Sequence, residues 1–227
     1  GLSIMALVGA AEIGTALGQV PVGTRVVELW FALVGDHAAD VQRFSQQVLS
    51  DEERARTRLY RSRDAAERYV LTRSLTRAVL GARLGAQPRS VPVTHTAAGK
   101  PLAPGLHFNV SHSGDLILLA VCDTHAVGVD VERKRDIPRV RALEQRWLSD
   151  AERVDLRRLE ASGSTPSDAF LRVWSVKEAK LKALGVGISG AGVAETRSIE
   201  ALPLSEELLG RVGAASRERY VGAVAFA

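Results

Sequence analysis

The 227-residue chain has one cysteine, few aromatic residues and no apolar run long enough to read as a membrane span. Its single cysteine, Cys122, cannot form an internal disulfide, which fits a reducing cytoplasm. Aromatic residues make up 5% of the chain and no nucleic-acid-binding motif is present, so the net charge of +4 does not by itself indicate a nucleic-acid partner. An acidic protein or a polyphosphate ligand explains the basic balance equally well.

The N-terminal segment, residues 1–23, contains no Lys or Arg and therefore lacks the basic start of a signal peptide. Glu12, Pro21 and several glycines interrupt its apolar residues, which argues against a membrane span. We expect residues 1–24 to form an N-terminal extension or arm, and we expect a cytoplasmic protein with no membrane association.

The rest of the chain alternates between predicted helices and strands, and hydrophobic residues, 46% of the total, are ample for a core. Capping-box patterns at Ser50 and Ser149 open two helices, and glycines at 85 and 185 close two more. No sequence repeat is visible at a fixed period. The predicted strands are 25–34, 91–94, 107–110, 116–122, 127–132, 193–199 and 218–226; the predicted helices begin at 51 and span 64–84, 150–161 and 168–184.

The most informative motif is the segment Gly128–Glu132, in which polar and apolar residues alternate. A period of two predicts a strand with one buried face, so that Asp130 and Glu132 point the same way with Cβ atoms roughly 7 Å apart. Two such carboxylates can share one hard cation, because Mg²⁺ prefers oxygen ligands and commonly takes one or two carboxylates together with substrate phosphates. A solvated strand face is the alternative interpretation of this motif taken alone.

A second motif, Trp174–Lys182, lies on the predicted helix that ends before Gly185. Glu178 and Lys182 are four residues apart and share one face of this helix. Taken alone, they form an ordinary ion pair worth about 0.3–0.5 kcal/mol. That interpretation leaves the carboxylate motif and the segment that precedes it unexplained.

The preceding segment combines the turn Gly99–Pro101 with the short run Phe108–Ser113. A glycine in such a turn lets the backbone approach a flat or charged ligand, and Lys100 supplies a point charge. Ser111, His112 and the next serine bring two hydroxyls and an imidazole to one place, although a simple turn or a core histidine fits the same residues. Adjacent Ser and His are not a catalytic triad, and the G-x-S-x-G elbow of a serine hydrolase is absent.

In this order, the segments resemble the phosphopantetheinyl transferases of the surfactin-synthetase-activating (Sfp) type. That family shows a G-K/R-P turn, an F-N-x-S-H-S segment, a G-[IV]-D-x-E strand and a W-x-x-K-E-x-x-x-K helix, and all four stand in this sequence. The resemblance implies an α+β fold: a pseudo-two-fold pair of similar halves, each a small mostly antiparallel sheet packed with helices, with the active site between them. We expect the two halves at residues 25–108 and 109–227.

The resemblance also implies the activity, which is transfer of 4'-phosphopantetheine from coenzyme A to a serine of an apo acyl or peptidyl carrier protein. Adenosine 3',5'-bisphosphate is the by-product. Mg²⁺ is the implied cofactor, with Mn²⁺ as a substitute, and coenzyme A is the co-substrate. The implied partners are coenzyme A and the carrier protein, with no nucleic acid and no membrane, and the two-half architecture suggests a monomer.

Four residues carry the implied catalysis. Asp130, Glu132 and Glu178 are expected to hold the metal, and Glu178 either completes the metal shell or takes the serine proton. Lys182 is expected to neutralise the leaving phosphate. Catalysis of this kind consists mostly of positioning and charge neutralisation.

Coenzyme A binding is implied for a separate set of residues. Lys100 and Pro101 are expected to border the adenine, and two arginines to hold the 3'-phosphate, since an Arg fork suits phosphate better than Lys does. One basic position of the family falls on Glu53 here, which is a departure from the family pattern. The expected coenzyme A-binding residues are Arg56, Arg68, Lys100, Pro101, Ser111, His112 and Lys177, with Arg58 as a weaker candidate.

Three other classes of function fit parts of the sequence: a Mg²⁺-dependent coenzyme A phosphohydrolase, a non-catalytic coenzyme A-binding protein and a basic nucleic-acid binder. For the transferase, the stretch Pro138–Leu148 is a candidate surface for carrier docking. It carries Arg139, Arg141 and Arg146 beside apolar residues, and it lies between the metal strand and the motif helix. A core-packing helix with a solvated basic face is the alternative.

Overall fold

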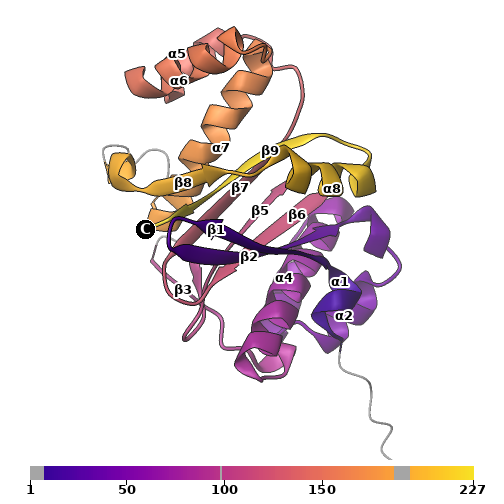
Figure 1. Ribbon diagram of the computed structural model, residues 1–227. Helices are drawn as coiled ribbons and strands as arrows, with labels where there is room; N and C mark the ends of the chain where they lie inside the picture. The colour runs from indigo at the N-terminus through magenta and orange to yellow at the C-terminus, as the bar shows by residue number, and fades with distance from the viewer. Residues whose placement is uncertain (1–7, 98, 187–194) are drawn as a thin grey trace, which may run out of the picture.

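Two antiparallel sheets form the frame of the computed structural model, which describes residues 8–97, 99–186 and 195–227 (Figure 1). The first sheet has the order β1-β2-β6-β5 and the second the order β7-β9-β8. A two-stranded pair, β3 and β4, lies beside them. The strands are β1 (Thr15–Val22), β2 (Arg25–Leu33), β3 (Thr94–His95), β4 (Pro101–Leu102), β5 (His107–Ser113), β6 (Leu116–Cys122), β7 (Val127–Arg133), β8 (Glu200–Pro203) and β9 (Tyr220–Phe226).

One long helix belongs to each sheet: α4 packs on the first, and α7 packs on β7 and β9 of the second (Figure 1). Shorter helices surround them. The helices are α1 (Ala10–Ile13), α2 (Val41–Gln47), α3 (Asp51–Thr57), α4 (Arg63–Leu84), α5 (Val140–Trp147), α6 (Asp150–Ala161), α7 (Pro166–Leu184) and α8 (Glu206–Ser216). None of the helices in these described ranges is long and apolar enough to cross a bilayer.

The two halves repeat one topology. In each, a first strand (β2 or β7) is followed by helices that end in the long helix, and then by two strands of which the last pairs with the first. The resulting strand orders, β2-β6-β5 and β7-β9-β8, are equivalent. The predicted α+β fold with two similar, mostly antiparallel halves is thereby confirmed.

The two sheets divide at a different residue from the predicted division at 108/109. Strands β5 and β6 belong to the first sheet, so the division falls between Cys122 and Val127. Of the predicted N-terminal arm, residues 15–22 form β1, an edge strand paired with β2, and Ile13 is fully buried beside Leu75. From residue 8 onward, this segment is therefore part of the folded first half.

Helix boundaries agree closely with the capping and glycine signals, whereas two predicted strands differ: the strand predicted at 91–94 is only the short β3, Thr94–His95, and the strand predicted at 193–199 is displaced. Ser50 and Ser149 form the two capping boxes, and Gly85 and Gly185 end α4 and α7 in the left-handed conformation. Residues 195–198 form a 3₁₀ turn, so that the strand predicted at 193–199 begins only at Glu200; residues 193 and 194 lie outside the described ranges. β-branched residues alone did not locate the strand, because pairing with β9 decides it.

Two large cores lie on the two faces of the first sheet. One lies between the first sheet and α4, with Phe44, Leu71 and Phe108 among its fully buried side chains. The other lies between the two sheets and receives apolar side chains from both, including Leu29 and Phe226. Because this second core is shared, the site described next has a fixed position at the junction of the halves.

Candidate active site at the junction of the halves

Strand β7 has one face in the shared core and the other against α7. Val127, Val129 and Val131 are fully buried in the core, as their alternation predicted. Gly128 lies opposite them under α7, where an added Cβ would stand 2.0 Å from the Ala179 carbonyl oxygen. Only glycine therefore allows the helix to lie this close to the strand, and the closeness brings α7 side chains to the β7 carboxylates.

Lys182 of α7 reaches across to β7. Its Nζ lies 2.6 Å from Asp130 Oδ1 and 3.2 Å from the Val129 carbonyl oxygen. Asp130 is only 5% exposed. The simple helix pair between Glu178 and Lys182 is thus replaced by an ion pair that joins helix to strand.

Side chains of β5 take the place of a backbone ladder between β5 and β7. Asn109 Oδ1 accepts a hydrogen bond from the Val129 amide at 2.9 Å, and Ser111 Oγ accepts one from the Val131 amide at 3.2 Å. Ser113 Oγ continues the series with the amide of residue 133 at 2.9 Å. The constant offset of the partners means that the two strands run in the same direction. We call Asn109, Ser111 and Ser113 the serine seam.

The two seam hydroxyls also donate to the carboxylates of β7. Ser111 Oγ lies 3.1 Å from Asp130 Oδ1, and Ser113 Oγ lies 3.4 Å from Glu132 Oε2. Each serine therefore fixes both the strand and one carboxylate of it. Ser111 is buried and is also 3.3 Å from Lys182 Nζ, so in this structure its hydroxyl is occupied by protein partners.

Within the ranges that the structure describes, two carboxylate oxygen atoms of the site accept no hydrogen bond. Asp130 Oδ2 and Glu178 Oε1 are buried and have no hydrogen-bond partner among the described residues. Burial raises the pKa of both carboxyls, and the charge of Asp130 adds to the rise at Glu178. Buried, unpaired carboxylate oxygens that repel one another fit a hard cation, which supplies the missing partner.

A complete metal cage is not preassembled. Within the described ranges, no three Asp, Glu, His or Cys side chains converge closely enough to form one. Lys182 lies against Asp130, and Arg135 lies 3.1 Å from Glu132 Oε2. The predicted set of Asp130, Glu132 and Glu178 therefore stays a prediction, supported by the donor chemistry.

His112 lies next to two cations at the edge of the site. The outer edge of the ring is exposed, while partial burial and the charges of Arg68 and Lys182 lower its pKa. Arg68 Nε is buried without a hydrogen-bond partner in the described part of the chain. Arg68 and Lys182 thus place positive charge on either side of a neutral imidazole, and an anionic ligand would be stabilised there.

Two predicted ligand contacts have protein partners instead. Lys100 Nζ donates to the carbonyl oxygens of Lys182 and Ala183, both at 2.8 Å, and so binds the C-terminal end of α7. Lys177 is buried and donates to the Trp147 carbonyl oxygen at 2.6 Å and to Glu152 at 2.9 Å. The predicted phosphate contact by Lys177 disagrees with this geometry, because position 177 lies on a different face of α7 from Glu178.

The remaining predicted residues lie at the margins. Arg56 is exposed, with its guanidinium 5.9 Å from the Tyr69 ring centre, and Pro101 pairs with His95 in the small β3–β4 ladder. Sequence reasoning missed the roles of Asn109 and Ser113. Their signal was the period of two, which places both on the same side of β5 as Ser111.

Comparisons with known proteins agree with this geometry. Two family models match: "4'-phosphopantetheinyl transferase, N-terminal" at residues 38–124 and "4'-phosphopantetheinyl transferase superfamily" at residues 126–223. Their boundary coincides with the division between the two sheets.

Curated relatives carry the same name. The chain is similar to the 4'-phosphopantetheinyl transferase HetI of Nostoc sp. (32% identity over 72% of this chain and 70% of HetI) and to Sfp of Bacillus subtilis (31% over 62% of each). It is also similar to the L-aminoadipate-semialdehyde dehydrogenase-phosphopantetheinyl transferase of Schizosaccharomyces pombe (29% over 64% of this chain and 62% of the relative). Proteins of this family transfer phosphopantetheine from coenzyme A to carrier proteins. The chain belongs to the 4'-phosphopantetheinyl transferase family, a family of transferase enzymes, as its motifs predicted.

Proposed function

We propose that this protein transfers 4'-phosphopantetheine from coenzyme A to a serine of an apo acyl or peptidyl carrier protein. The observation that carries the proposal is the group formed by the Lys182–Asp130 ion pair and the two orphaned oxygens of Asp130 and Glu178. This group lies at the junction of the halves, in a chain that belongs to the transferase family.

The reaction exchanges one oxygen–phosphorus bond for another. The serine oxygen attacks the β-phosphorus, its proton leaves, and the bond from that phosphorus to the bridging oxygen breaks, so that adenosine 3',5'-bisphosphate departs. Lys182 would neutralise charge on the departing phosphate. Asp130, Glu132 and Glu178 would hold Mg²⁺, or Mn²⁺ in its place, which supplies charge neutralisation at the pyrophosphate when bound.

Glu178 suits the role of proton acceptor. Its carboxyl is half-buried on α7, and burial and the neighbouring acids raise its pKa. A carboxylate with a raised pKa is a better base at neutral pH than an exposed one. Either it accepts the serine proton directly, or a bound water molecule carries the proton to it.

The nucleotide would be held at the positive edge of the site. Arg68 and His112 lie together there and suit the 3'-phosphate, with Arg56 as a more distant contributor. Lys100 and Pro101 would border the adenine with their aliphatic parts, because the Lys100 ammonium binds the end of α7. We assign Lys177 a structural role instead of a phosphate contact.

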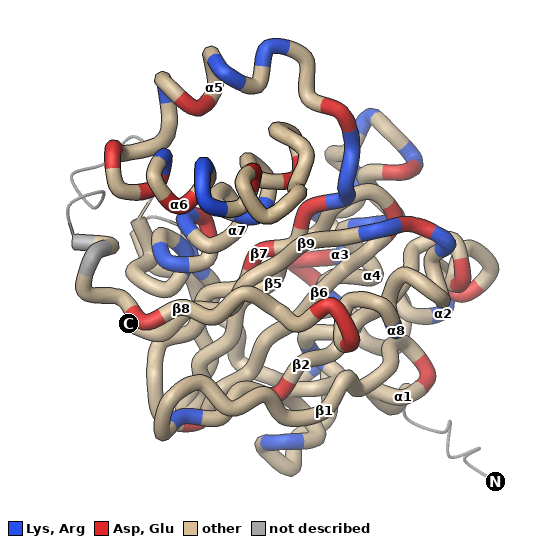
Figure 2. The backbone as a smooth tube through the Cα atoms, turned by 45° about the horizontal axis from the view of Figure 1, so that its top comes forward, with Lys and Arg blue, Asp and Glu red and all other residues tan. Residues whose placement is uncertain are grey.

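The proposed carrier-docking surface is the exposed side of α5 and its approach. Lys and Arg recur along the β7–α5 connection and α5 (Figure 2). Arg141 is bound to Glu144 and Glu160, whereas Arg139 and Arg146 are exposed and make no ion pair with another described residue. Arg139 and Arg146 are therefore the better docking residues, and their contribution should fade with salt.

One assay separates the candidate functions. Apo carrier protein is incubated with coenzyme A and Mg²⁺ and analysed by mass spectrometry, and we expect the mass of one phosphopantetheine group on the carrier. Free phosphopantetheine without modified carrier would indicate the phosphohydrolase, and binding without turnover would indicate a coenzyme A-binding protein. A monomeric state and a cytoplasmic location remain predictions.

A further inference from the structure

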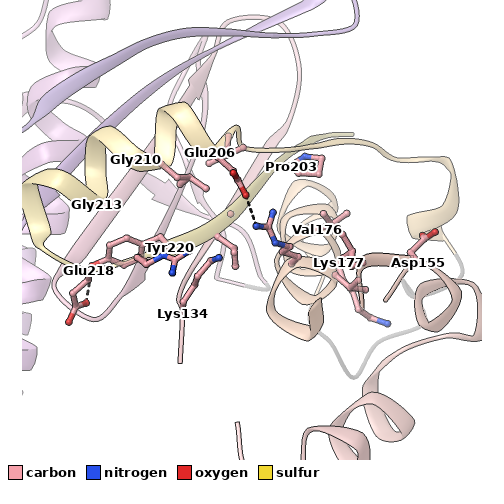
Figure 3. A pocket seen from close by; sticks show the side chains of 18 of the residues that line it. Lys134, Asp155, Val176, Lys177, Pro203, Glu206, Gly210, Gly213, Glu218 and Tyr220 are labelled. Atoms are coloured by element: carbon pink, nitrogen blue, oxygen red, sulfur yellow. Dashed lines mark hydrogen bonds and ion pairs between the residues drawn. The ribbon is translucent and has the colours of Figure 1, made fainter. Parts of the chain in front are cut away.

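A cavity lies in the C-terminal half, away from the proposed active site. It has a volume of about 960 Å³ and opens between α8, α7 and β9 (Figure 3). Helix α7 lines it with Arg172, Val176 and Lys180. Glu178 and Lys182 lie on nearly the opposite face, because two residues turn a helix by about 200°. The cavity is therefore separate from the carboxylate site.

Part of the wall of this cavity is apolar. Val173, Leu204, Leu209 and Tyr220 line it and are buried. Its volume is at the upper end of the range for small-molecule sites, about 300–1,000 Å³. A site of this kind accepts an apolar body and uses a few polar groups at its rim to fix orientation.

Helix α8 leaves part of this space open. Gly210 lines the cavity, and a Cβ added to it would meet no atom within 4 Å. Packing therefore does not require glycine here, although glycine inside a helix costs about 1 kcal/mol relative to alanine. Gly213 differs, since its Cβ would lie 2.7 Å from the Glu218 carbonyl oxygen. The missing side chain at Gly210 leaves the cavity wider, and it lowers the stability of α8 relative to alanine at this position.

Charges around the cavity do not balance. Glu206 forms an ion pair with Arg172 at 2.8 Å, and Glu218 accepts a hydrogen bond from the Tyr220 hydroxyl (Figure 3). Glu218 also forms an ion pair with Arg133. The other two lining carboxylates, at 152 and 155, are bound by a lysine and an arginine. By contrast, three lining cations form no side-chain hydrogen bond or ion pair with any described residue: Lys180, Arg217 and Arg219.

We propose that this cavity binds a small amphipathic anion, an aliphatic chain that carries one carboxylate or phosphate head. The chain lies along the apolar walls beside Gly210, and the head faces the unpaired cations. Surplus positive charge at the rim selects against a cationic head, and the apolar walls select against a free inorganic anion. This site goes beyond the proposed transfer reaction and shares no carboxylate with it.

The test is calorimetric titration of the whole protein with decanoate, decyl phosphate and decyltrimethylammonium, each below its micelle concentration. We expect both anions to bind and the cation not to bind. Gly210→Trp should weaken decanoate at least about tenfold by filling the space, whereas the matched Gly210→Ala should change it less than about twofold. Phosphopantetheine transfer by both variants should match that of the wild type.

A second variant leaves the apolar wall of the cavity unchanged and alters only its rim. Arg217→Glu combined with Arg219→Glu changes only the exposed rim and should weaken decanoate about fivefold or more. The inference is overturned if decanoate does not bind, if decyltrimethylammonium binds as well, or if a folded Gly210→Trp protein binds decanoate like the wild type. Displacement of decanoate by coenzyme A would also overturn it, because the ligand would then occupy the transferase site.

Discussion

In each half of the molecule, a glutamate of a shorter helix binds a cation of the long helix. In the N-terminal half, Glu53 is the third residue of α3 and binds Arg73 and Arg77 of α4, both at 2.5 Å. In the C-terminal half, Glu152 is the third residue of α6 and binds Lys177 of α7 at 2.9 Å. The two carboxylates therefore have equivalent places in the repeated topology.

The repeat is also visible in the sequence once the structure aligns the halves. Residues 49–54 read Leu-Ser-Asp-Glu-Glu-Arg, and residues 148–153 read Leu-Ser-Asp-Ala-Glu-Arg. With Arg77 matched to Lys177, the positions of Glu178 and Lys182 fall on Ala78 and Ala82 in α4. The two halves thus share their frame, and only the C-terminal long helix carries the charged pair at these positions.

This difference shows how one topology serves two purposes. In the N-terminal half the ionic contacts are structural, and Arg77 also donates to the carbonyl oxygens of Pro88, Arg89 and Val91. In the C-terminal half, Lys177 alone makes the equivalent structural contact, with Glu152. The adjacent face of α7 carries Glu178 and Lys182, which point to the β7 carboxylates. Glu53, a departure from the family pattern, is explained by this structural cluster.

The largest expected effect tests the charged site that only the C-terminal half carries, where Asp130 of β7 faces Lys182 of α7. Asp130→Asn should lower kcat about 10³-fold, because it removes the charge that faces Lys182 and the proposed cation. Glu67→Gln, the same kind of change on α4, should stay within about twofold, as a surface ion pair contributes little. Carrier modification followed by mass spectrometry measures both. Near-normal turnover by a folded Asp130→Asn protein would place catalysis elsewhere.

The next effect compares the two equivalent glutamates, Glu53 and Glu152. Glu53→Gln keeps the capping box but leaves two arginines without their anion, so the free energy of unfolding should fall by about 3–5 kcal/mol. Glu152→Gln affects one lysine and should cost about 1–3 kcal/mol. Urea denaturation of each variant measures the difference. Equal losses would show that the second arginine adds nothing.

A smaller effect concerns the ends of the long helices. Helix α4 ends with Gly85 alone, whereas α7 ends with Gly185 and the ammonium of Lys100 from the other half. Lys100→Met should lower the free energy of unfolding by about 1 kcal/mol, because the last carbonyl groups of α7 lose their cation. Lys100→Arg is the matched control and should recover part of the loss. If only the KM for coenzyme A changed, the ammonium would act on the nucleotide and not on the helix.

The smallest effect is a pH dependence confined to the N-terminal half. Burial would raise the pKa of Glu53, but Arg73 and Arg77 outweigh it and hold the pKa below its ordinary value of 4.5. The charged form therefore stabilises the fold above the unfolded-state pKa, and this stabilisation is lost as pH falls through the lower folded-state pKa. The stability difference between wild type and Glu53→Gln should shrink on acidification. A difference independent of pH would contradict the ionic interpretation.

Local signals in the sequence predicted much of this structure, and interactions between distant segments account for the rest. Capping boxes, terminal glycines and the Val127–Val131 alternation act within a few residues, so they gave the helix limits and the buried face of β7. The serine seam and the Lys100 contact join residues far apart in the chain. The period of two places the seam residues on one face of β5, but no local pattern identifies the partners of these residues or of Lys100. The repeat at residues 49 and 148 has no fixed period, because the segments around it differ in length. The division between the halves was misplaced because strand pairing, which no local pattern shows, assigns β5 and β6 to the first sheet.

The serine seam has a consequence for how this molecule can change. A backbone ladder survives almost any substitution, because every residue except proline carries the same amide and carbonyl. Between β5 and β7, however, the acceptors are side chains at positions 109, 111 and 113. These contacts between the halves therefore depend on the side chains that three codons specify. A single-base change in one of these codons can remove a contact while both sheets remain intact.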